Sequence, residues 1–105
     1  MLKKLQKEHK VWLDHNFGGQ PSYHSLLGVV EEVGELSHAH LKNEQGIRTN
    51  EDHIALAKDA IADIVIFLAS YCNSREFDFE EIIQSTWNEV KKRDWIKFPK
   101  DGINK

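Results

Sequence analysis

The sequence predicts an all-α fold in which four helices form a bundle. Four stretches of the 105-residue chain place apolar side chains three or four positions apart, the spacing of one helix face. Short breaks rich in polar residues, glycine or proline separate them, and no stretch alternates as a half-buried strand does. We expect a single domain over residues 1–99, with 100–105 as a loose tail.

The first two helices are marked by periodicity and by a break between them. Leu5, Trp12 and Leu13 recur at helical spacing, which predicts a first helix over about residues 2–16. The sequence GGQP at 18–21 ends this helix, because paired glycines and a proline do not continue one cheaply. Ser22 is expected to cap the second helix, which should run to about residue 43.

The last two helices follow capping patterns. Thr49, with Asp52 three residues later, resembles a capping box for the third helix. This helix is apolar nearly all round over 60–72, so it lies at the centre of the fold or forms a subunit interface. Asp78 with Glu81 predicts the start of a fourth helix, which should continue to about residue 95.

Charge and composition argue against several classes of protein. The formal net charge is −3 and no long basic run is present, which argues against nucleic acid as a partner. We see neither a signal peptide nor a long uncharged apolar run, so we expect no membrane association. The single cysteine, Cys72, permits no intrachain disulfide and favours a reducing, cytoplasmic location.

Three glutamates interrupt the apolar run of the second helix. Glu31, Glu32 and Glu35 lie within one helical turn of each other and share a face. Two carboxylates about 4 Å apart repel by about 4 kcal/mol at an effective dielectric of about 20, so a cation is expected between them. Gly34 should permit close packing of a second helix beside them.

A second acidic pair, Asp59 and Asp63, lies four residues apart in the third helix. Asp63 has apolar neighbours on both sides, and an ionised carboxylate there requires a metal or a basic partner. If the two helices pack antiparallel, their acids form a divalent-cation site suited to Mg²⁺, with Mn²⁺ as the alternative. Phosphate oxygens and water usually complete such a site, which predicts attack of activated water on a phosphoanhydride.

The histidines offer weaker alternatives. His38 and His40 are two residues apart and the other four are scattered, so the usual zinc-ligand spacing is not found. Glu35 and His38 supply one Glu-x-x-His pair of the kind that di-iron bundles use. The third helix has no second pair, which argues against a di-iron centre.

The two acidic motifs together carry a resemblance to a known family. The sequence EEVGE at 31–35, followed by DAIAD at 59–63, resembles the MazG-like all-α nucleoside triphosphate pyrophosphohydrolases, whose pattern is Glu-Glu-x-x-Glu, a gap and Glu-x-x-Asp. The resemblance covers residues 5–99, including the basic, aromatic ending RDWIKFP. It implies Mg²⁺-dependent cleavage between the α and β phosphates of a (d)NTP, which yields a nucleoside monophosphate and pyrophosphate.

The resemblance also implies roles for the acids. Glu32, Glu35 and Asp63 match metal positions, and we expect Glu31 or Glu35 to orient or deprotonate the attacking water. The chain departs from the pattern three residues before Asp63, where it has alanine. The adjacent Asp59 is expected to supply the missing oxygen.

Further expectations concern the substrate and the assembly. The base should meet aromatic and amide groups by stacking and hydrogen bonding, although the aromatic rings alternatively form plain core. Basic residues at the end of the fourth helix should neutralise the triphosphate or, alternatively, complement the helix end. The apolar third helix predicts a homodimer or homotetramer. Two other function classes stay open, a nucleotide-binding regulatory module without hydrolysis and a structural adaptor. The expected substrate contacts are Trp12, His15, Asn16, Phe67, Lys91 and Arg93.

Overall fold

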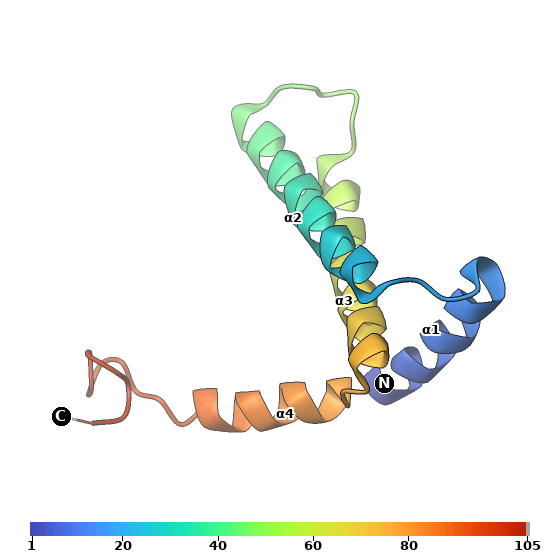
Figure 1. Ribbon diagram of the computed structural model, residues 1–105. Coiled ribbons are helices and arrows are strands. Elements are labelled where there is room, and N and C mark those ends of the chain that lie inside the picture. The colour runs from blue at the N-terminus through green and yellow to red at the C-terminus, as the bar shows by residue number, and fades with distance from the viewer. Residues whose placement is uncertain (105) are drawn as a thin grey trace.

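The computed structural model describes residues 1–104 and contains four α-helices and no strand over that range. The all-α prediction is therefore confirmed. Figure 1 shows α2 and α3 side by side as a long antiparallel hairpin, with α1 beside the far end of α3 and α4 directed away from the hairpin. The helices are α1 (Leu2–Phe17), α2 (Ser22–Gln45), α3 (His53–Arg75) and α4 (Phe79–Val90).

Two of the predicted helix starts differ in the structure. Ser22 is already the first residue of α2, and Pro21 precedes it without any side-chain cap, so the prediction of a Ser22 cap was wrong. Asp52, and not Thr49, caps α3, because its carboxylate accepts a 3.1 Å hydrogen bond from the backbone N–H of Ala55. The carboxylate of Asp78 caps α4 in the same way, as predicted.

The chain after α4 differs from the expected helix end and loose tail. α4 ends at Val90, and residues 91–104 form turns. The N–H of Asp94 donates to the carbonyl of Gly102 at 2.9 Å, and the N–H of Gly102 donates to the carbonyl of Phe98 at 2.8 Å. A side chain at 102 would approach Arg93 to 2.8 Å, so this glycine allows the turn to close against the segment after α4.

α2 and α3 approach each other closely at a glycine, but not at the predicted one. A Cβ atom at Gly28 would lie 2.5 Å from the ring of Phe67, whereas a Cβ atom at Gly34 would meet nothing within 4 Å. The prediction that Gly34 permits close helix packing was therefore wrong, and Gly28 has that role.

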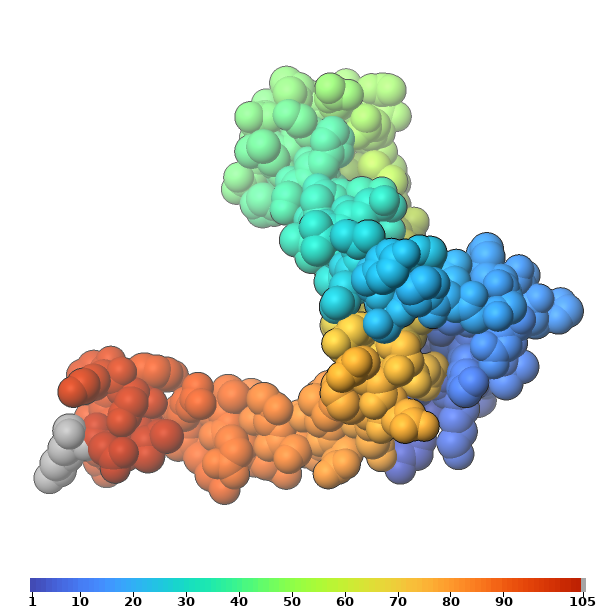
Figure 2. Space-filling view, in the orientation of Figure 1, coloured from blue at the N-terminus to red at the C-terminus, as the bar shows by residue number. Residues whose placement is uncertain are grey.

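One chain leaves much of its apolar surface exposed. A small buried cluster of Ala69, Cys72 and Phe79 joins α3 to the start of α4, and within residues 1–104 α4 makes no contact with α2. The accessible surface is 8121 Å², compared with about 6,100 Å² expected for a folded chain of 12.2 kDa. The radius of gyration is 17.6 Å, compared with about 13 Å expected. Figure 2 shows this open outline, so a single chain does not close the expected bundle.

Membrane insertion was also considered. Over the described residues, none of the helices combines the length and the apolar character that a membrane span requires.

Candidate functional site

The α2–α3 hairpin brings four of the predicted acids to one cavity. Glu31 and Glu35 of α2 and Asp59 and Asp63 of α3 line a cavity of about 580 Å³. This volume lies within the usual range for small-molecule sites. The motifs are separated in sequence, and the antiparallel packing of the two helices places them together as predicted.

Glu32 occupies the most enclosed position of the acidic group. Glu32 is only 8% exposed, whereas Glu31 and Glu35 are exposed. Each of these three glutamates offers a carboxylate oxygen within 4.8 Å of the others. Burial, followed by a side-chain hydrogen bond with Glu35 and by the charges of Glu35, Asp63 and Glu31, raises the pKa of Glu32 above its ordinary value.

The acidic group has no compensating base. Among residues 1–104, none of the five carboxylates forms an ion pair with lysine, arginine or histidine. Oε2 of Glu32 is buried and has no hydrogen-bond partner there. Exposed acids alone do not identify a metal, but a buried, unpartnered oxygen surrounded by carboxylates fits a hard divalent cation. Glu32, Glu35, Asp59 and Asp63 are the residues that would hold it.

The alanine that departs from the family-like pattern is buried, and the aspartate before it lines the cavity. Ala60, at the position where the pattern has glutamate, is 1% exposed and therefore buried in the fold. Asp59 is exposed and lines the cavity together with Asp63. The chain thus has a carboxylate on the cavity wall, one position before the one that the pattern predicts.

The predicted base contacts are not brought to the acidic cavity. Trp12, His15 and Asn16 are exposed on α1, and none of them lines it. The ring of Trp12 lies 5.8 Å from that of Phe17, and the side-chain amide of Asn16 donates to the carbonyl of Trp12 at 2.8 Å. Phe67, also predicted to meet the base, is half-buried against Gly28.

The predicted phosphate contacts also lie elsewhere in the single chain. Lys91 and Arg93 follow α4, which points away from the hairpin in Figure 1, and neither lines the cavity.

Two further residues line the cavity wall: the sequence analysis noted His38 only as part of a Glu-x-x-His pair, and it did not single out Glu51. His38, one turn beyond Glu35, and Glu51, in the loop before α3, complete the polar lining. His38 lies at helical spacing from Glu35, which is a usable signal. Glu51 has no such signal, because its position depends on how the loop returns to the hairpin.

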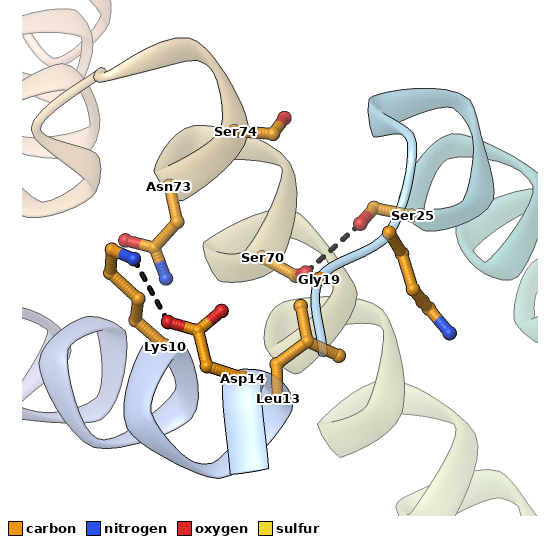
Figure 3. A pocket seen from close by; sticks show the side chains of 9 residues that line it. Lys10, Leu13, Asp14, Gly19, Ser25, Ser70, Asn73 and Ser74 are labelled. Atoms are coloured by element: carbon orange, nitrogen blue, oxygen red, sulfur yellow. Dashed lines mark hydrogen bonds and ion pairs between the residues drawn. The ribbon is translucent and has the colours of Figure 1, made fainter. Parts of the chain in front are cut away.

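A smaller pocket of about 120 Å³ lies between α1, the loop that follows it and α3 (Figure 3). Its main polar groups already have partners. The ammonium of Lys10 lies 3.1 Å from the carboxylate of Asp14, and the buried hydroxyl of Ser25 donates to that of Ser70 at 3.0 Å. We therefore assign this pocket to the packing of the helices, not to a ligand.

Comparisons with known proteins assign no family: no family model, no curated protein and no solved structure matches the chain.

Proposed function

We propose that the protein is a Mg²⁺-dependent nucleoside triphosphate pyrophosphohydrolase of the MazG-like type. It would cleave the bond between the α and β phosphates of a (d)NTP and release a nucleoside monophosphate and pyrophosphate. The observation that carries the proposal is the buried, unpartnered Oε2 of Glu32, which lies among carboxylates without a counter-ion. Two of these neighbours, Glu31 and Glu35, line a cavity of ligand size. Such a group is stabilised by a cation that also binds phosphate.

The acids divide into two roles in this proposal. Glu32, Glu35 and Asp63, supported by Asp59, would hold Mg²⁺, which supplies positive charge to the phosphate oxygens and activates water. Glu31, or Glu35, would orient the attacking water and accept its proton. Both of these glutamates are exposed, so the proton can pass on to solvent.

The substrate contacts away from the acids belong to the same proposal. Trp12, His15 and Asn16 are accessible on α1 for stacking and hydrogen bonding to a base. Phe67 lies one turn beyond Asp63 on α3, and its ring is half-buried against Gly28.

A second copy of the chain is part of the proposed active form. The surface exceeds that expected of a monomer by about 2,000 Å², which is the scale that an obligate dimer buries. Leu26, Val30 and Val33 form an exposed apolar stripe on α2. Residues 83, 87 and 90 form another on α4, which has no partner beyond its first turn.

We propose that α4 of one copy covers the hairpin of the other in a homodimer, or in a homotetramer built from such dimers. This would bury both apolar stripes and complete the four-helix packing. It would also bring Lys91 and Arg93 to the triphosphate in the partner's cavity.

The direct test is pyrophosphate release from a panel of NTPs and dNTPs with Mg²⁺. Asp63→Asn should lower turnover at least about 100-fold, because the metal loses a charged ligand. Glu44→Gln, which removes an exposed acid of α2 outside the cavity, is the matched control. Full activity of Asp63→Asn would contradict the assignment.

A nucleotide-binding module without hydrolysis is the second candidate, because Ala60 occupies a position where the pattern has a metal ligand. In that case NTP with Mg²⁺ would raise Tm while no pyrophosphate formed. Asp59→Asn tests the compensation: if Asp59 serves as a ligand, this variant should lose activity almost as fully as Asp63→Asn.

A further inference from the structure

Three side chains meet where the loop between α2 and α3 returns to the hairpin. Oε2 of Glu51 lies 3.3 Å from Nε2 of His38 and 3.7 Å from Nδ1 of His53. The carboxylate of Glu51 is thus flanked by one imidazole from α2 and one from the first residue of α3. None of these three residues belongs to the acidic group assigned above.

The hydrogen bonding of His53 leaves one of its nitrogens without a partner. Nε2 lies 3.0 Å from the carbonyl oxygen of Ile47, which can only accept, so Nε2 carries the proton. In the neutral ring, Nδ1 then carries a lone pair and no proton. It faces a carboxylate oxygen, is buried and has no hydrogen-bond partner. The side chain is 8% exposed, so water does not satisfy this nitrogen.

This arrangement is the one that metal-bound histidines have. Such a histidine donates its second ring N–H to a carbonyl or carboxylate, which fixes the tautomer and aims the other nitrogen at the metal. His53 has that bond to Ile47 already. A cation between Nδ1 and Glu51 would turn two facing lone pairs into two ligands.

Two of the three ligand separations suit a tetrahedral site. Ligand atoms bonded at about 2.1 Å around a tetrahedral ion lie about 3.4 Å apart. The separations of 3.3 Å and 3.7 Å from Glu51 are close to this value. The nitrogens of His38 and His53 lie more than 4.8 Å apart, because over residues 1–104 only the group of Glu31, Glu32 and Glu35 has all its ligand atoms within that distance. His38, whose side chain is 40% exposed, has room to turn toward His53.

We infer that His38, Glu51 and His53 form a second metal site, which binds a transition metal of the Zn²⁺ class. Two imidazoles and one carboxylate favour such an ion over Mg²⁺, which prefers oxygen ligands throughout. His38 and Glu51 also line the acidic cavity, so the fourth coordination position opens toward it. The bound ion ties the α2–α3 loop to α2 and fixes that end of the cavity.

The test is a titration of the metal-free full chain with Co²⁺, in excess Mg²⁺ so that the carboxylate site is occupied. The expected result is one equivalent of Co²⁺ with tetrahedral visible absorption, displaced by Zn²⁺, and a rise in Tm with Zn²⁺. His38→Asn and Glu51→Gln should each weaken Co²⁺ binding at least about tenfold. These two side chains are partly exposed, so the variants should fold, which circular dichroism checks.

His40→Asn is the matched control. His40 forms an exposed pair with Glu44 on the same helix at 3.5 Å. The substitution therefore removes an imidazole beside a glutamate and leaves the proposed site intact. It should bind Co²⁺ like the wild type. Absence of tetrahedral Co²⁺ binding, or equal affinity in wild type, His38→Asn and Glu51→Gln, would overturn the inference. Neither result depends on NTP turnover, so this inference and the proposed hydrolysis fail separately.

Discussion

Two glycines of α2 distinguish packing from helix propensity at the scale of single residues. Gly28→Ala would place a methyl group 2.5 Å from the Phe67 ring, and overpacking of this kind costs about 1–3 kcal/mol. Gly34→Ala meets nothing within 4 Å and should stabilise the helix by about 1 kcal/mol. Urea unfolding of both variants measures the difference, and similar stabilities would show that the contact with Phe67 is not rigid.

The raised pKa of Glu32 links stability to pH. Between the ordinary pKa of 4.5 and the raised value, the folded state binds more protons than the unfolded state. The metal-free protein should therefore lose stability as pH rises through this window. Glu32→Gln should remove the loss and stabilise the metal-free protein at neutral pH, because the neutral amide avoids both the burial of a charge and the repulsion by the neighbouring carboxylates.

Urea titrations at pH 4.5 and pH 7 measure this effect, and Glu44→Gln, at an exposed acid of α2 outside the cavity, is the control. Mg²⁺ should restore the stability of the wild type at pH 7 but not raise that of Glu32→Gln to the same extent. Identical pH profiles for wild type and Glu32→Gln would rule out the burial of this charge.

At the scale of helices, the start of α3 offers a sharp comparison. Asp52→Ala removes the carboxylate that accepts the N–H of Ala55, and loss of such a cap costs about 1 kcal/mol. Thr49→Ala removes the residue that the sequence favoured, which makes no cap bond, and should be close to neutral. Thermal unfolding of the two variants measures the loss of stability in each. An equal loss of stability in Thr49→Ala would indicate a different helix start.

The sequence predicted the helices well, because periodicity and breakers are local signals. Capping was less predictable, since Thr49 and Asp52 both suit the position and only the path of the loop selects one. The acids were found because like charges on one apolar face are visible as a pattern. The position of Glu51 and the close approach at Gly28 could not be predicted, because both depend on how α2 and α3 meet in space.

At the scale of the whole molecule, the exposed stripes predict association. Val30→Arg, at a residue 70% exposed in the single chain, should place charge in the proposed α2 interface and convert the dimer to monomer. Val11→Arg, 72% exposed on α1 outside both stripes, is the matched control and should leave the mass unchanged. Light scattering after size exclusion measures the mass, and a monomeric wild type would contradict the proposed assembly.

The five acids of the proposed Mg²⁺ site, two of them aspartates of α3 and three of them glutamates of α2, come from two consecutive helices joined by a seven-residue loop, 46–52. Contacts between neighbours along the chain form early in folding, so the hairpin can assemble before α1 and α4 dock. The acids then repel one another at a stage when little else holds the two helices together. Dissolved divalent cations would therefore act on the speed of folding as well as on the finished protein.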